Sequence, residues 1–168
     1  GAWFGVTTRL GGVSDGPYAA LNLGLGVGDR REAVLENRSR MRSAAGVPDD
    51  SPRMPRQVHG AAIVTASELG TEADGVLVRA GDPWVAVTVA DCAPVAVVAA
   101  DARSGALLHS GWRGSRDGIA VRAVERLWRD GVSASSLSVS IGPCIHACCY
   151  PVGPAVADAV PAFCLIPH

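Results

Sequence analysis

Apolar residues through most of the chain come in short runs, separated by polar breaks that contain Gly, Asp or Pro. Runs of this length, rich in Val, Leu, Ile and Ala, are typical of strands, and the breaks are typical of turns. The predicted strands cover residues 4–8, 61–65, 74–78, 84–90, 94–99, 106–109 and 137–141.

Two longer segments instead carry apolar residues at helical spacing. The first is predicted to be a helix over residues 31–45 that ends at Gly46 and Pro48. The second is predicted over residues 115–129. Its expected apolar side consists of Ile119, Val121, Val124, Leu127 and Trp128. A last helix is predicted to begin within 153–160, and residues 162–168 look like an uncompleted element.

Few helices and many strands joined by short turns favour an α+β fold, a mixed sheet with flanking helices, over a doubly wound parallel sheet. The length of 168 residues favours a single domain over 1–168. No stretch of 18 uncharged apolar residues suggests a membrane span. Five cysteines in a chain too large to need disulfide staples indicate reduced thiols and a cytoplasmic protein.

Charge and residue counts exclude several functions. Fifteen basic and sixteen acidic residues give a net charge of −1, so we expect neither nucleic acid nor a membrane surface as partner. All basic residues are Arg, which excludes Schiff-base chemistry and the lysine-dependent phosphate loop. A multicopper oxidase needs roughly ten imidazoles for its coppers, so this chain alone, with four histidines, cannot be one.

Three polar clusters stand at the ends of predicted strands, at 57–60, 90–92 and 109–114. His59, Cys92 and His109, one from each, form a candidate set of two imidazoles and one thiolate. Such a set suits zinc, and three protein ligands leave the fourth tetrahedral position open. Because these residues are 33 and 17 positions apart, their convergence is an expectation. The alternative is a loop histidine, a buried cysteine and a core histidine with no shared role.

The same residues also allow a metal-free cysteine hydrolase. Cys92 would be the nucleophile, and His59 or His109 its base. Asp91 or Gln57 would orient that base. Sequence spacing does not separate this hypothesis from the metal site.

A third region holds three cysteines and a histidine within six residues, at Cys144, His146, Cys148 and Cys149. Adjacent cysteines do not have the usual spacing of zinc ligands. We therefore expect small buried thiols in a tight loop.

Three arginines are candidate anion ligands, because a guanidinium binds phosphate or carboxylate bidentately. Arg9 precedes a Gly-Gly turn, and Arg113 lies in a Gly-flanked turn at a predicted helix start. Arg38 lies on the first predicted helix. The alternative for each is a solvated surface charge.

Several motifs occur together and in a fixed order. They read TTRLGGVS at 7–14, LNLG at 21–24, QVHG at 57–60, ADCAPV at 90–95, HSGWRG at 109–114 and IGPCI at 141–145. In these motifs the chain resembles the laccase-domain family also labelled polyphenol oxidase, the YfiH-like DUF152 group. The resemblance implies the sandwich-like fold shared with the catalytic domain of cytotoxic necrotizing factor. It also implies that members are longer, so we expect this domain to lack a C-terminal part.

The resemblance also implies a function. It assigns zinc to His59, Cys92 and His109, and with them phosphorolysis of adenosine, inosine, guanosine and methylthioadenosine, plus deamination of adenosine. Purine nucleosides and phosphate are then the expected partners. The residues expected to bind substrate or phosphate are Arg9, Asn22, Arg38 and Arg113. Asp91, Cys92 and His109 are the expected catalytic residues, and His146 is a second candidate for proton transfer. A catalytically silent domain that keeps its metal site is a further alternative.

Overall fold

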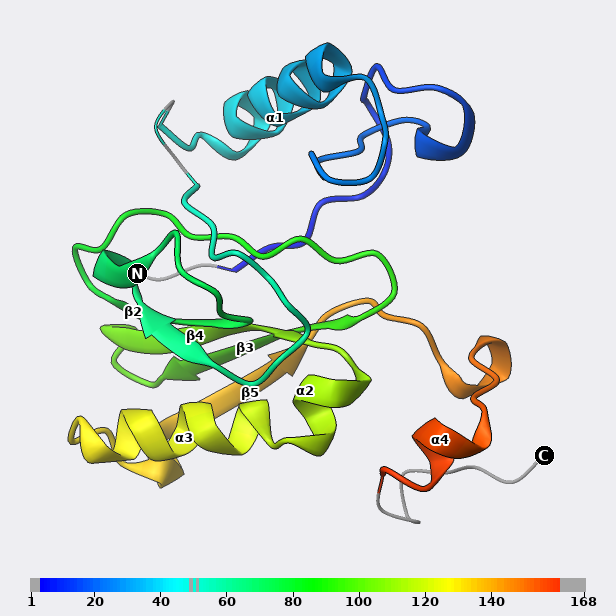
Figure 1. Cartoon of the computed structure of the whole chain (residues 1–168). Coiled ribbons are helices and arrows are strands. Elements are labelled where there is room, and N and C mark those ends of the chain that lie inside the picture. Colours follow the sequence, from blue (N-terminus) through cyan, green and yellow to red (C-terminus); the bar gives the residue numbers. More distant parts are fainter. Residues whose placement is uncertain (1–3, 49, 51, 161–168) are drawn as a thin grey trace.

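The computed structural model describes residues 4–48, 50 and 52–160. Its centre is one five-stranded mixed sheet with the strand order β1-β2-β4-β3-β5 (Figure 1). The strands are β1 (Ile63–Thr65), β2 (Gly75–Arg79), β3 (Ala93–Ala99), β4 (Ser104–Ser110) and β5 (Leu137–Ile141). β1 and β2 are parallel, and the other neighbouring strands are antiparallel. The predicted α+β class with a mixed sheet is confirmed.

Helices lie on both sides of this sheet (Figure 1). On one side are α2 (Trp112–Arg116) and α3 (Ile119–Arg129), and on the other is α1 (Arg31–Ala45). The other helices of the described residues are α4 (Pro154–Ala157) and short 3-10 turns at Gly16–Tyr18, Ala66–Glu68, Ala134–Ser136 and Ala147–Cys149. Within the described ranges, no helix is both long and apolar enough to cross a bilayer.

The core forms where α3 packs on the sheet. Ile119, Ala123 and Leu127 recur every four residues and are buried together with side chains of β2, β3 and β4. Fully burying a side chain such as Leu127 contributes about 1.5–3 kcal/mol. Val121 and Trp128 were predicted on this apolar side, and that prediction is wrong. They are 62% and 63% exposed, because they lie off the four-residue stripe.

Two helix predictions differ in outcome. The helix over 31–45 has the bounds expected, and Gly46 ends it in the left-handed conformation at φ 63°. The helix over 115–129 is instead divided at Asp117 and Gly118, where Gly118 takes φ 75°. α4 is a short part of the segment predicted at 153–160, and residues 162–168 lie outside the described residues.

Two strand predictions are wrong. Residues 4–8 are exposed and take no part in the sheet. Residues 84–90 make one isolated bridge, between Val85 and Arg53. The run at 84–90 bonds instead to the irregular segment that contains Arg53 and Gln57, and it pairs with neither edge strand of the sheet, β1 or β5. A strand needs a partner, which apolar character alone does not provide.

The N-terminal segment folds back on α1 around one fully buried amide, Asn37. Its Oδ1 accepts the backbone N–H of Val13 at 2.8 Å. Its Nδ2 donates to the Ser14 hydroxyl and to the carbonyls of Ala20 and Asn22, at 2.9, 3.1 and 2.9 Å. Asn37 therefore ties two turns of an irregular segment to a regular helix.

Candidate metal centre

The structure brings His59, Cys92 and His109 together. One ligand atom from each lies within 4.8 Å of those of the other two. The two imidazole rings are edge to face, with centroids 4.7 Å apart. His109 is buried, Cys92 half-buried and His59 exposed, so the group opens to solvent on one side. Two imidazoles and a thiolate at this separation fit a tetrahedral zinc ion with one open position.

Each ligand comes from a different segment around one end of the sheet. His109 is in β4, paired with Pro94 of β3. Cys92 directly precedes β3, and His59 lies in the loop that leads to β1. Because β3 and β4 are antiparallel, the start of β3 meets the end of β4. Sheet pairing thus places two ligands that are far apart in the sequence side by side.

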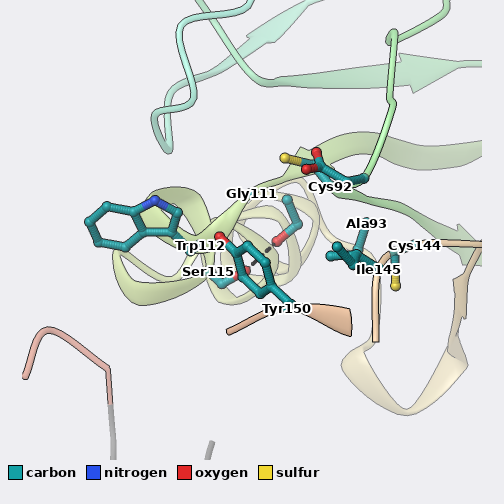
Figure 2. A pocket seen from close by; sticks show the side chains of 10 residues that line it. Cys92, Ala93, Gly111, Trp112, Ser115, Cys144, Ile145 and Tyr150 are labelled. Carbon is teal, nitrogen blue, oxygen red and sulfur yellow. Dashed lines mark hydrogen bonds between the residues drawn. The ribbon is translucent and has the colours of Figure 1, made fainter. Parts of the chain in front are cut away.

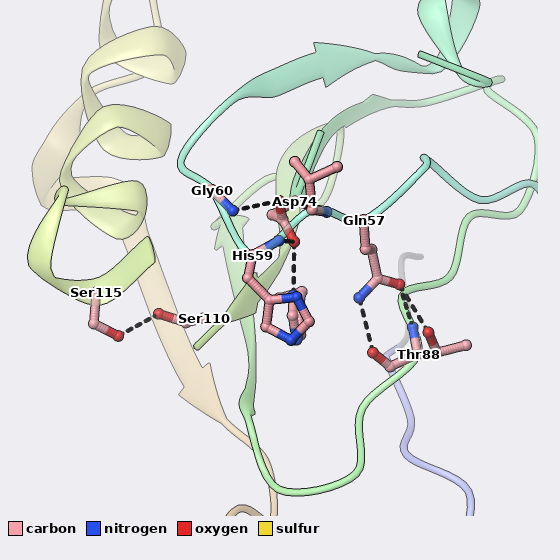
Figure 3. A network of polar contacts seen from close by, with 9 residues as sticks. Gln57, His59, Gly60, Asp74, Thr88, Ser110 and Ser115 are labelled. Carbon is pink, nitrogen blue, oxygen red and sulfur yellow. Dashed lines mark hydrogen bonds and ion pairs between the residues drawn. The ribbon is translucent and has the colours of Figure 1, made fainter. Parts of the chain in front are cut away.

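The buried carboxylate of Asp74 positions both histidines (Figure 3). Its oxygens accept the backbone N–H groups of Val58, His59 and Gly60 at 3.1, 2.9 and 2.7 Å. This holds His59 in the left-handed region at φ 60°, which is unfavourable for a side chain other than glycine. Asp74 Oδ1 also lies 2.7 Å from His109 Nδ1. With the proton on Nδ1, the Nε2 of His109 keeps its lone pair for a metal.

Asp74 is not among the site residues predicted from the sequence. It lies at the start of a predicted strand, and an aspartate there, before Gly75, was the one available signal. The hypothesis that Gln57 orients a catalytic histidine does not fit the structure. The Gln57 amide instead donates to the carbonyl of Thr88 at 2.8 Å and accepts its backbone N–H at 2.7 Å. Gln57 thereby holds the irregular segment that contains Thr88 (Figure 3).

A pocket of about 200 Å³ adjoins the three-ligand group (Figure 2). Its lining includes the ligand Cys92, the neighbouring Asp91 and the aromatic residues Trp112 and Tyr150. Cys144 and the hydroxyl pair Ser110 and Ser115, 2.9 Å apart, also line it. The volume is smaller than the roughly 300–1,000 Å³ of most ligand sites, so it suits part of a larger ligand.

The electrostatic environment of Cys92 does not favour a metal-free nucleophile. Burial raises the pKa of the Cys92 thiol, and the adjacent Asp91 carboxylate raises it further. A reactive cysteine needs a lowered pKa, provided by a positive neighbour. A metal cation held by the thiol and the two imidazoles would supply that positive charge.

The predicted anion ligands fall into two groups. Arg113 lies in α2 with its guanidinium 4.5 Å from the ring centre of Trp112, a residue of the pocket wall. Arg9, Asn22 and Arg38 instead bond within the N-terminal part of the chain. Arg9 donates to the Ala19 carbonyl, Arg38 to the Leu23 carbonyl at 2.8 Å, and Asn22 to Asp29 at 2.9 Å. Their contact with substrate stays a prediction.

The sequence predicts buried cysteines at 144–149, and that prediction is wrong. Cys148 and Cys149 are exposed, Cys144 is half-buried, and His146 is exposed. Among the described residues, these side chains do not form a metal-ligating group like that of His59, Cys92 and His109. The loop is held at its start, where the Ile145 N–H donates to the carbonyl of Asp91 at 2.9 Å, and it stands out toward solvent.

Gly111 has no side chain, and this leaves room for the ligands Cys92 and His59. A methyl group at this position would lie 3.0 Å from Cys92 Sγ and 3.4 Å from a ring carbon of His59. We expect Gly111→Ala to displace the thiol and to lower the zinc affinity about tenfold, as other disturbances of ligand orientation do. Competition with a chromophoric chelator measures it. Gly153→Ala is the control, because its added methyl group would lie in open space. Equal zinc affinities in the two variants would contradict the prediction.

Asp74 should also make the metal-free protein sensitive to acid. Burial raises the pKa of its carboxyl, but hydrogen bonds from His109, Gly60, Val58 and His59 outweigh this and lower it overall. Because the pKa is lower in the folded state, the ionised carboxylate stabilises the fold fully above the unfolded-state pKa of about 3.9. This stabilisation is lost as the pH falls through the lower, folded-state pKa. We expect the free energy of unfolding, measured with urea and a chelator, to fall below about pH 4. If the free energy of unfolding of an Asp74→Asn variant fell equally steeply with decreasing pH, this prediction would be contradicted.

The fold and this site define an α+β protein with a His-Cys-His candidate metal centre beside a pocket whose lining includes two aromatic residues. The chain belongs to the family described as multi-copper polyphenol oxidoreductase laccase, which residues 3–164 match. Its similarity to solved structures agrees. The crystal structure of YlmD from Geobacillus stearothermophilus has a TM-score of 0.83 at 40% identity over 91% of this chain. That of the Bacillus licheniformis protein YfiH has a TM-score of 0.84 at 27% identity over 90%.

Curated relatives carry the name purine nucleoside phosphorylase. One is YlmD of Geobacillus stearothermophilus, 40% identical over 95% of this chain. Another is Rv2149c of Mycobacterium tuberculosis, 38% identical over 93% of this chain. The matched region makes up 63% and 64% of the length of these two relatives.

Proposed function

We propose that this chain carries the metal centre and part of the substrate pocket of a zinc-dependent purine nucleoside phosphorylase. The observation that supports this best is the meeting of His59, Cys92 and His109 beside a pocket with two aromatic residues. The names of the relatives supply the reaction. The family's description points to copper oxidase chemistry, but the four histidines of this chain alone are too few for that set of coppers.

The residues of the pocket suit the parts of a nucleoside reaction. When bound, zinc supplies a Lewis acid at the open coordination position. Trp112 and Tyr150 offer apolar surface to a purine. Arg113, stacked on Trp112, is the predicted arginine nearest this wall and is our choice for the phosphate. Positioned charge of this kind is the main requirement when phosphate attacks C1′ of the ribose and the base leaves.

Asp91 is our choice for proton transfer to or from the departing purine. It lines the pocket and directly precedes the ligand Cys92. As the resemblance implies, we also assign the broad range of adenosine, inosine, guanosine and methylthioadenosine, together with deamination of adenosine. Ammonia release from adenosine without phosphate would separate deamination from phosphorolysis.

The first experiment is the metal content of protein purified without added metal, beside Cys92→Ala and His109→Ala. We expect about one zinc per chain, lost in both variants. The same samples are then given inosine with and without phosphate. Phosphate-dependent release of hypoxanthine, absent in both variants, is the expected result.

Other outcomes would overturn the proposal in distinguishable ways. Copper in place of zinc would favour an oxidase. Zinc without turnover of any purine nucleoside would favour a silent metal-binding domain. Absence of metal, with rapid alkylation of Cys92 at neutral pH, would favour the cysteine hydrolase.

A further inference from the structure

Cys148 and Cys149 form an exposed pair of adjacent thiols that the proposed function does not use. Their sulfur atoms are 3.1 Å apart and hydrogen-bonded. Both side chains are exposed, at the 3-10 turn Ala147–Cys149. We propose that this pair is a redox-modification site, which peroxides convert reversibly into a disulfide between Cys148 and Cys149.

The distance between the sulfurs favours a disulfide over a bound metal. Two thiolates around a tetrahedral zinc ion lie about 3.8 Å apart, given a Zn–S bond of about 2.3 Å. A disulfide bond is about 2.05 Å long. The observed 3.1 Å is already shorter than the zinc separation, and about 1 Å of approach would complete the bond. Exposure lets a small oxidant reach both sulfurs.

Such a disulfide would be easily reduced again. Neighbouring Cα atoms across a trans peptide are about 3.8 Å apart, whereas disulfides usually join Cα atoms about 4.4–6.8 Å apart. The bond between adjacent residues is therefore strained. Strained, exposed disulfides have more oxidising potentials and are the labile, regulatory ones. These properties suit a switch rather than a structural cross-link.

The chemistry is balanced with a hydroperoxide as the oxidant. The thiolate of Cys148 attacks one peroxide oxygen, the O–O bond breaks, and an alcohol or water leaves with a proton from solvent. The sulfenic acid of Cys148 is then attacked by the sulfur of Cys149. The S–O bond breaks, water leaves with the Cys149 proton, and the S–S bond forms. The hydrogen bond with Cys148 raises the pKa of Cys149, which supports Cys148 as the first sulfur to react.

The disulfide would act on the pocket through Tyr150. Tyr150 follows Cys149 directly and lines the pocket together with Cys92 and Cys144. The loop is anchored at Ile145 by the carbonyl of Asp91 and is closed by the bond from the Cys149 N–H to the His146 carbonyl at 2.9 Å. Closing a ring between residues 148 and 149 changes the backbone of this turn and so moves the attachment point of Tyr150.

The test treats zinc-loaded protein with hydrogen peroxide, alkylates the remaining thiols and measures the masses of tryptic peptides. No Arg or Lys follows Arg129, so residues 130–168 stay together with four of the five cysteines, and variants must identify the pair. We expect this peptide to lose two hydrogens and two alkylation sites, and to regain both with dithiothreitol. Cys148→Ser and Cys149→Ser should each abolish the change, and the matched controls Cys144→Ser and Cys164→Ser should retain it.

Loss of the change in either control would reassign the pair and overturn the proposal. A disulfide-linked dimer on a non-reducing gel, or irreversible oxidation without loss of two hydrogens, would also overturn it. The effect on turnover rests on the proposed function, whereas the disulfide does not. If the chain phosphorolyses inosine, oxidation should reversibly slow turnover by the wild type and leave turnover by Cys148→Ser unaffected. If the chain does not phosphorolyse inosine, the mass measurement still decides whether the disulfide forms.

Discussion

The Asp74→Asn variant is expected to bind zinc roughly 10- to 100-fold more weakly than the wild type, the usual effect of losing a partner that orients a metal ligand. Asparagine has the same shape, but its amide nitrogen is a donor. It would face one of the backbone N–H groups of residues 58–60 or the protonated Nδ1 of His109. Both imidazole ligands would lose their fixed orientation together.

The same substitution should lower the free energy of unfolding by about 3 kcal/mol, because it disrupts a buried charged network. Urea unfolding measures this. Zinc affinity is then compared by chelator competition under conditions where circular dichroism shows the variant folded, which separates ligand positioning from loss of structure. Asp101→Asn, a substitution of an exposed turn carboxylate, is the control. A folded Asp74→Asn variant with wild-type zinc affinity would refute the positioning role.

The second large effect is expected for Asn37→Ala. The alanine removes every hydrogen bond by which the buried amide holds Val13, Ser14, Ala20 and Asn22. Each partly buried polar group left without a partner costs about 1–3 kcal/mol. We therefore expect the free energy of unfolding to fall by about 3 kcal/mol or more.

Hydrogen exchange should show where that loss falls. The N–H groups of Val13 and Ser14 are expected to lose protection, while those of β3 and β4 keep theirs under native conditions. Ser39→Ala, on the exposed side of the same helix, is the matched control. If the two variants unfold at the same urea concentration, Asn37 does not hold the N-terminal segment.

The local features of the fold were predictable from the sequence, and the features that depend on partners were not. α1 ends at Gly46 as expected because a glycine C-cap acts within its own turn. The run at 84–90 has the composition of a strand, but its bonds go to Arg53 and Gln57 in an irregular segment and not to a strand of the sheet. The prediction for Trp128 is wrong because position along the helix decides burial and size does not: the small Ala123 lies on the buried four-residue stripe, and the large Trp128 lies off it.

The candidate site shows the same division. The types of residue at 59, 92 and 109 were sufficient to suggest a metal set, and the structure brings these residues together. Asp74 was not predictable in the same way, because most of its partners are backbone N–H groups, which every residue except proline carries. Only the folded loop at 58–60 directs three of them at one carboxylate. The exposure of Cys148 and Cys149 likewise depends on how their loop leaves the sheet.

The separation of the three metal ligands along the chain has a thermodynamic consequence. An ion held by His59, Cys92 and His109 closes two loops, of 33 and 17 residues, that are open in the unfolded chain. It therefore acts as a removable cross-link whose strength depends on free metal. At a free concentration 100 times the Kd it adds about 2.7 kcal/mol to the stability of the fold. The melting temperature of this domain would thus report the metal supply of its surroundings.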